Sequence, residues 1–198
     1  MGLFAEAQHL PLPDSEITYY PNFFERNWAD TCFQELMDET PWQQDDIKVF
    51  GKIYAQPRLT ALYGNNGKSY SYSNITMQPH PFSERLLQIK TAIETQTVEK
   101  FTTCLMNLYR DGKDSNGWHA DDEKELGQNP VIASISFGHE RFFNLRHKED
   151  KTQKHKLLLE HGSLLLMAGP TQHFWQHQIA KTAKTVGPRI NLTFRIIR

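Results

Sequence analysis

Residues 107–123 have the sequence NLYRDGKDSNGWHADDE, and the rest of the chain is interpreted from this stretch. It starts as a strand-like run and ends in His119-x-Asp121, an imidazole and a carboxylate two positions apart. Alternate residues of a strand point the same way, so both side chains can bind one metal ion. Far downstream, His177 offers a third ligand. Two histidines and one carboxylate form the ligand set of non-haem Fe(II) sites with open coordination positions.

The third ligand is not identified by residue type alone, because the chain has nine histidines. His161 and His173 are alternatives to His177. His173 and His177 are four residues apart and would chelate together on a helix, but Pro170 and the strand-like pattern around them argue against a helix. An H-x-D pair also occurs by chance, so other segments must support the metal site.

A second pattern, near the C-terminus, places polar residues on one face of a strand. That face carries Arg189, Asn191, Thr193 and Arg195, and the other carries Ile190, Leu192, Phe194 and Ile196. Polar side chains inside a barrel are costly unless an anion lies beside them, and arginine binds carboxylates through two hydrogen bonds. Asn107 and Tyr109, alternate on an earlier strand, add donors. A polar strand that faces solvent is the alternative interpretation.

Short strand-like runs fill the second half of the chain. They cover residues 101–109, 131–137, 141–147, 155–160, 163–168 and 190–197, with glycine and proline between them. Amphipathic helices are predicted before them, over residues 23–39 with Asn22 as N-cap and over residues 82–97. This order predicts an α+β fold with a jelly-roll core and N-terminal helices packed outside it. Facing strands of such a core would bring His119, His177 and Arg189 to one barrel mouth.

The first half offers weaker patterns. Residues 1–22 are rich in proline and are predicted to be irregular. Residues 47–54 alternate like one strand, and its face with Lys48, Phe50, Lys52 and Tyr54 suits a charged backbone and stacked bases. Residues 55–79 are predicted to be mostly loop, with a short exposed strand at residues 69–73. The tyrosines of that strand fit either a half-buried strand or a stacking wall.

Charge is divided unevenly along the chain, although the formal net charge is only -1. Residues 1–46 contain ten acids and one base, whereas residues 47–198 contain 13 acids and 21 bases. The run from Arg146 to Lys156 predicts a basic hairpin loop and is the best local candidate for phosphate contacts. A polyanion partner and an ordinary solvated surface are both compatible with this contrast.

Processing and compartment signals are sparse. Cys32 and Cys104 fit free thiols in a reducing compartment. The first ten residues lack the features of a signal peptide, and no apolar run reaches the roughly 18 residues of a membrane helix. We expect a monomeric protein with no membrane association, in the cytoplasm, or in the nucleus if the source is eukaryotic.

Taken together, the segments from about residue 47 to the C-terminus resemble the AlkB family of Fe(II)- and 2-oxoglutarate-dependent nucleic-acid dealkylases. The likeness is to its eukaryotic double-strand DNA-repair branch in particular. The resembling segments include residues 49–52, 57–58, 63–64, 107–112, 119–123, 132–138, 146–148, 161–164, 177 and 188–195. The length of the chain and this resemblance together lead us to expect a single domain over residues 1–198. Its parts would be an N-terminal extension and helix (1–46), a nucleotide-recognition lid and helix (47–100) and a catalytic jelly roll (101–198).

The resemblance also implies roles for individual residues. The implied Fe(II) ligands are His119, Asp121 and His177. The implied 2-oxoglutarate contacts are Arg189, which pairs with the distal carboxylate, and Asn107, Tyr109, Thr193 and Arg195. The implied substrate contacts are Asp122 and Glu123 near the damaged base, Tyr70, Ser71 and Tyr72 in the lid, and Phe50, Gly51 and Lys52 in a finger that enters the base stack. Position 72 is Tyr where that branch tends to have Phe.

The implied activity is oxidative dealkylation of bases such as 1-methyladenine and 3-methylcytosine in single- or double-stranded DNA, with 2-oxoglutarate and O2 as co-substrates. An N-alkylated base is cationic, so nearby carboxylates favour it. Alkylation at the pairing edge also lowers the cost of flipping the base out of the duplex. Two alternatives remain: a noncatalytic module that binds alkylated nucleic acid, and the same oxygenase chemistry on RNA, protein or a small molecule.

Overall fold

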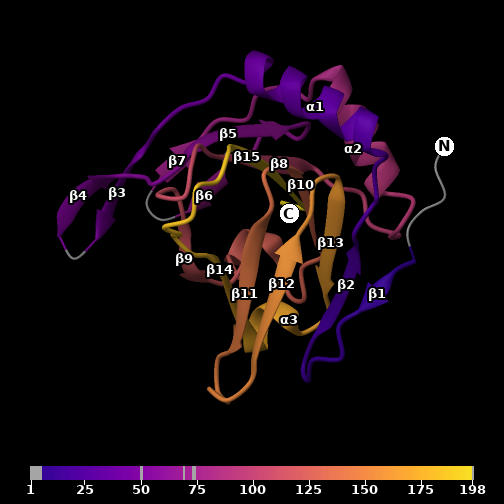
Figure 1. Cartoon of the computed structure of the whole chain (residues 1–198), viewed down its shortest axis with the longest axis vertical. Coiled ribbons are helices and arrows are strands. Elements are labelled where there is room, and N and C mark those ends of the chain that lie inside the picture. Colours follow the sequence, from indigo (N-terminus) through magenta and orange to yellow (C-terminus); the bar gives the residue numbers. More distant parts are fainter. Residues whose placement is uncertain (1–5, 50, 69, 73–74, 198) are drawn as a thin grey trace.

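The computed structural model of the chain describes residues 6–49, 51–68, 70–72 and 75–197, and two antiparallel sheets dominate it (Figure 1). The larger sheet has, in spatial order, β1 (Gln8–His9), β2 (Glu16–Tyr20), β13 (Ser163–Ala168), β10 (Ile132–Gly138), β15 (Arg189–Arg195), β8 (Thr103–Tyr109) and β5 (Leu59–Gly64). The smaller sheet has β12 (Lys154–Leu159), β11 (Arg141–His147), β14 (Trp175–Ile179) and β9 (Asn116–His119). This arrangement agrees with the predicted jelly-roll core.

The alternation along β15 divides its side chains between two layers. Ile190, Leu192 and Phe194 are fully buried on the face that carries helices α1 (Arg26–Glu39) and α2 (Glu84–Ile93). The intervening polar residues, from Arg189 to Arg195, face the space between the two sheets. The predicted separation of an apolar and a polar face is therefore confirmed, and the solvent-facing alternative is wrong.

Both predicted helices form, with shorter boundaries. The N-cap of α1 is Glu25, so the predicted Asn22 cap is wrong. The main-chain N–H of Phe24 donates to Gly162 O at 2.9 Å, which holds this segment as a turn against the larger sheet. Ser83 caps α2 through the Leu86 N–H. That helix ends early because the Glu94 carboxylate accepts the Phe101 N–H at 2.9 Å and turns the chain.

Residues 47–54 form a hairpin, so the prediction of one strand is wrong. Its arms are β3 (Asp46–Val49) and β4 (Lys52–Ala55), and Val49 pairs with Lys52. Gly51 has φ +79°, a conformation that glycine adopts without steric cost and that permits a tight reversal. Phe50 lies outside the described residues. The hairpin extends away from the rest of the molecule (Figure 1) and leaves Ile53 71% exposed.

Other strands were missed because partners far away in sequence stabilise them. β2 pairs with β13 and β5 pairs with β8, so residues 16–20 and 59–64 belong to the larger sheet and are neither irregular nor loop. β6 (Tyr70–Tyr72) and β7 (Ile75–Met77) form the short hairpin predicted in part. β9, β14 and the four-residue helix α3 (Thr171–Phe174) were also missed. In the described part of the chain, every helix is too short or too polar to cross a membrane.

The Arg141 side chain, 4% exposed, joins two loops beside the core. Its guanidinium donates to Asp111 O and Asp114 O, each at 3.1 Å, and to Ala180 O at 2.7 Å. The same loops meet where the Thr182 N–H donates to Gly112 O. One buried cation therefore satisfies three main-chain acceptors from segments about 70 residues apart.

We expect Arg141→Met to lower the free energy of unfolding by about 3 kcal/mol, because buried carbonyl oxygens without donors are costly. Urea unfolding at equilibrium measures this change. Lys154→Met, at an exposed position on β12, is the matched control and should change the free energy of unfolding little. Equal losses in the two variants would contradict the bracing role of Arg141.

Candidate active site

Three potential metal ligands meet where β9 ends beside the middle of β14. His177 on β14 lies directly opposite His119 on β9, and their rings are 4.2 Å apart between centroids. Asp121 follows β9 by two residues. Ligand atoms of His119, Asp121 and His177 all lie within 4.8 Å of one another. Two imidazoles and one carboxylate at this spacing can occupy one face of a metal ion and leave other positions open.

The Asp121 carboxylate is held in its ionised form. Its side chain is almost fully buried, and Oδ1 accepts Arg195 Nη2 at 2.6 Å. Burial raises the pKa of this carboxyl, but the positive charge of Arg195 outweighs burial and leaves the pKa below its usual value. A carboxylate has about four acceptor positions, so the ion pair leaves capacity for a cation.

The two imidazoles present nitrogen lone pairs. Burial, with repulsion from His119, lowers the pKa of His177 to about 3, so this ring is neutral at physiological pH. His119 Nδ1 lies 2.7 Å from Gly117 O, and because a carbonyl only accepts, Nδ1 carries the hydrogen. Nε2 is then the His119 nitrogen that can face a ligand, and Asn116 Nδ2 lies 3.2 Å from it. Neutral imidazoles oriented by a second hydrogen bond are the form that binds metals.

A cavity of about 370 Å³ opens beside these ligands, and β15 contributes four of its lining residues. Arg189 is 1% exposed, and its Nη2 donates to Ser136 Oγ at 2.9 Å. Its Nε and Nη1 are buried without a hydrogen-bond acceptor among the described residues. Burial lowers the pKa of Arg189 to about 10, with the Tyr109 phenol opposing it, so the group stays cationic. Two unsatisfied charged donors in a closed site favour a carboxylate ligand.

The amides and hydroxyls around Arg189 form a connected network. Asn191 Nδ2 donates to Ser134 Oγ at 2.8 Å, and Thr193 Oγ1 donates to Asn191 Oδ1 at 3.0 Å. Asn107 Nδ2 approaches the same oxygen at 3.4 Å. The residues predicted to contact 2-oxoglutarate all line this cavity: Asn107, Tyr109, Arg189, Thr193 and Arg195. A metal triad and an unsatisfied guanidinium in one cavity fit Fe(II) together with a keto-diacid.

Several cavity residues were missed by the sequence analysis. Arg58, directly before β5, is buried, and its Nε donates to Asn107 Oδ1 at 2.7 Å. The sequence predicts a loop over residues 55–79, and in a loop Arg58 has no predicted partner. Ser134 and Ser136 were detectable, since they occupy the face of β10 that alternates with the apolar Ala133, Ile135 and Phe137. Hydroxyls inside an apolar strand indicate a polar site behind it.

The predicted substrate residues are only partly brought together. Glu123 lines the cavity, whereas Asp122 is exposed and forms an ion pair with Lys148 at 3.1 Å. Gly51 and Lys52 lie on the extended β3–β4 hairpin. The main chain of Tyr70, Ser71 and Tyr72 forms β6, and Phe50 lies outside the described residues.

The two alternative histidines lie away from the triad. His161 is 3.1 Å from Asp30, at the α1 side of the larger sheet. His173 lies on α3, and its Nε2 is 2.8 Å from Asn129 Oδ1. A short helix, α3, does form directly after Pro170, so the prediction of no helix in this segment is wrong for residues 171–174. Because α3 ends at Phe174 and His177 is on a strand, no helix carries both histidines, and that part of the prediction is confirmed.

Comparison with known proteins agrees with this geometry. Residues 16–195 match the model of the 2OG-Fe(II) oxygenase superfamily, so most of the N-terminal segment left outside the resemblance belongs to the family's domain. The chain is 43% identical over 201 residues to "Alpha-ketoglutarate-dependent dioxygenase alkB homolog 3" of Bos taurus, covering 94% of this chain and 68% of that one. It is 40% identical over 189 residues to "DNA oxidative demethylase ALKBH2" of Bos taurus, covering 90% and 68%.

A solved structure of OsALKBH1 superposes with a TM-score of 0.64 and 19% identity, covering 96% of this chain and all of that one, which shows the shared fold. The resemblance to the AlkB family is thereby confirmed. The chain belongs to the AlkB family within the 2OG-Fe(II) oxygenase superfamily, and it is a dioxygenase that depends on Fe(II), 2-oxoglutarate and O2.

Proposed function

We propose that this protein repairs N-alkylated bases in DNA by oxidative dealkylation, with 1-methyladenine and 3-methylcytosine as substrates. The observation that carries the proposal is the single cavity that holds both the His119, Asp121 and His177 cluster and the unsatisfied guanidinium of Arg189. The iron, when bound with 2-oxoglutarate and O2, supplies the oxidising power that hydroxylates the alkyl carbon. The hydroxylated alkyl group then leaves as an aldehyde and restores the base.

In this proposal the protein supplies ligands, charge and exclusion of water. His119, Asp121 and His177 bind Fe(II), and Arg189 pairs with the distal carboxylate of 2-oxoglutarate. Asn107, Tyr109, Thr193 and Arg195 complete the co-substrate site. Glu123, which lines the cavity, provides a negative charge for a cationic alkylated base. Because these groups lie in a cavity, the base must leave the stack to reach them.

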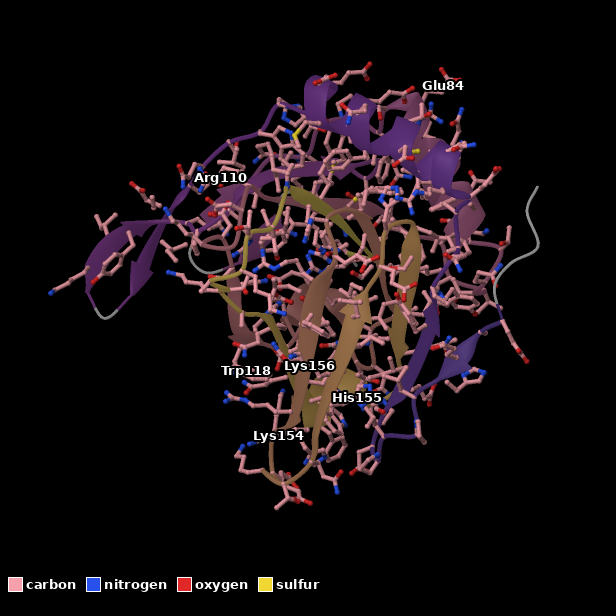
Figure 2. All side chains as sticks on the ribbon, viewed as in Figure 1. Glu84, Arg110, Trp118, Lys154, His155 and Lys156 are labelled. Carbon is pink, nitrogen blue, oxygen red and sulfur yellow. The ribbon has the colours of Figure 1, made fainter. Side chains whose placement is uncertain are left out.

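A nucleic-acid substrate is supported by the similarity to a DNA oxidative demethylase and by a cationic surface on the smaller sheet. The predicted basic hairpin forms between β11 and β12, where Arg146 pairs in register with Lys154. The Arg146 guanidinium lies 4.2 Å from the centre of the Trp118 ring, and Lys156 Nζ lies 3.9 Å from that of Phe142. Figure 2 shows Trp118, Lys154 and Lys156 in the lower part of the molecule. Cations interleaved with rings suit phosphates and bases.

The test is turnover on matched single- and double-stranded oligonucleotides that contain one 1-methyladenine. We expect formaldehyde and succinate in equal amounts, dependent on Fe(II) and O2. If iron-loaded protein binds the methylated DNA but forms neither product, the noncatalytic binding module is the correct alternative. Turnover on methylated RNA or on a peptide, with none on DNA, would show instead that the substrate is RNA or protein.

The finger role carried over to Phe50 gives a separate prediction. We expect Phe50→Ala to lower turnover about tenfold on duplex DNA and less than about twofold on single strands, because a ring that fills the stack matters only in a duplex. Steady-state turnover on both substrates measures the two ratios. Leu87→Ala, at an exposed position on α2, is the control. Equal losses of turnover on duplex and single-stranded DNA would contradict the finger role of Phe50.

A further inference from the structure

A buried glutamine on α3 contacts the main chain of the proposed carboxylate ligand. Gln172 is completely buried, and its Oε1 accepts the Asp121 N–H at 2.9 Å. The two residues are 51 positions apart in sequence. Gln172 lies on the short helix that directly precedes β14, the strand of His177. This hydrogen bond therefore links the segment that carries His119 and Asp121 to the segment that carries His177.

The hydrogen bond is needed because Asp121 lies beyond the end of its strand. The pairing between β9 and β14 stops at His119 opposite His177. Asp121 is 2% exposed, so water is a poor substitute as an acceptor for its N–H. A buried N–H without an acceptor is costly, and the Gln172 amide is the partner that the fold provides.

The glutamine is itself held from several sides. Its Nε2 lies 3.6 Å from Met167 Sδ, and its main-chain oxygen accepts Lys148 Nζ at 2.9 Å. The same ammonium pairs with Asp122 at 3.1 Å, so α3 is joined to two successive residues after β9. Thr171 fixes the start of α3 by donating to Ala168 O at 2.6 Å. The side chain of Gln172 therefore has little freedom to follow Asp121 if that segment moves.

We propose that Gln172 is a positioning residue that holds the Asp121 main chain so that the carboxylate faces the two imidazoles. The inference rests on the proposed metal site. A ligand set that is oriented before the metal arrives binds it more tightly, and loss of such a supporting hydrogen bond typically costs about 10–100-fold in metal affinity. Gln172 thus acts on metal binding through Asp121 and does not itself touch the cavity.

The test is titration of the metal-free full-length protein with Co(II), followed by its visible absorption bands. Gln172→Met keeps the length and volume of the side chain but removes the acceptor oxygen. We expect its Co(II) dissociation constant to rise about 10–100-fold, with altered band intensities, while the protein remains folded by circular dichroism. Gln176→Met is the matched control, because Gln176 is one residue from His177 but its amide oxygen accepts from Arg146 and not from the Asp121 segment. The control should bind Co(II) like the wild type.

The outcomes separate this inference from the proposed function. If Asp121→Ala loses Co(II) binding and Gln172→Met binds like the wild type, the positioning role is overturned and the metal site stands. If Asp121→Ala binds like the wild type, the metal site itself is wrong. Should Gln172→Met fail to fold, Gln172→Asn gives the same test, because it keeps the amide on a side chain one methylene too short to reach Asp121.

Discussion

Asp121→Ala is expected to abolish turnover on methylated DNA, since it removes the anionic ligand and leaves only the two imidazoles. Its measured effects should be loss of Co(II) binding and loss of formaldehyde release. The variant should also lower the free energy of unfolding by about 3–5 kcal/mol, because it leaves the buried Arg195 guanidinium without its carboxylate. Removal of the Asp121 carboxylate should therefore lower both metal binding and stability.

Asp121→Asn separates these two consequences. It keeps the size of the side chain and an oxygen that can accept from Arg195, so its unfolding free energy should fall much less than that of Asp121→Ala. It lacks the negative charge that a divalent ion requires, so it should remain inactive. Asp114→Asn is the control, because Asp114 is equally buried but pairs with Arg110 away from the cavity. Retained turnover in either variant at position 121 would reject the proposed metal ligands.

The site was predictable from sequence where a local pattern carries it. The alternation of β15 places its polar side chains on one face through strand geometry, as predicted. His119-x-Asp121 was predicted on the same basis, but β9 ends at His119, and Asp121 is held beyond the strand by contacts with Gln172 and Arg195. The polar residues of β15 and the His119–Asp121 segment meet because both belong to the same two-sheet core. The resemblance then identified His177 among nine histidines, and the register of β9 against β14 agrees with that choice.

The parts that were missed depend on contacts between distant segments. β5 is a strand because β8 lies beside it, and only then does Arg58 reach Asn107. Gln172 gave no signal, because one glutamine among polar residues has no period, and its role arises only where α3 passes the end of β9. The alternation of residues 47–54 fits one strand as well as it fits a hairpin, and the turn at Gly51 divides the segment into two strands. Local periodicity contains no information about such pairings.

Arg189→Met is expected to raise the KM for 2-oxoglutarate about 100-fold or more, since charge-assisted hydrogen bonds to a carboxylate are worth about 1.5–3 kcal/mol each. The turnover number at saturating 2-oxoglutarate should change much less. In the protein without co-substrate, the same substitution should leave the free energy of unfolding unchanged or higher, because it replaces a buried cation with two unsatisfied donors by an apolar side chain. The substitution should therefore weaken the binding of 2-oxoglutarate without lowering the stability of the protein.

Steady-state turnover at varied 2-oxoglutarate concentration measures the KM. Thermal unfolding with and without 2-oxoglutarate measures the stability of the protein and the gain that binding adds to it. The wild type should gain stability from the co-substrate, and Arg189→Met should lose that gain because a ligand stabilises only the state it binds. Arg189→Lys keeps the charge but lacks the planar pair of donors, so its KM should lie between the other two. Arg110→Met, which removes a guanidinium that pairs with Asp114 outside the cavity, should leave the KM unchanged. A wild-type KM in Arg189→Met would show that the buried guanidinium serves some other anion, and the keto-diacid site would have to lie elsewhere in the cavity.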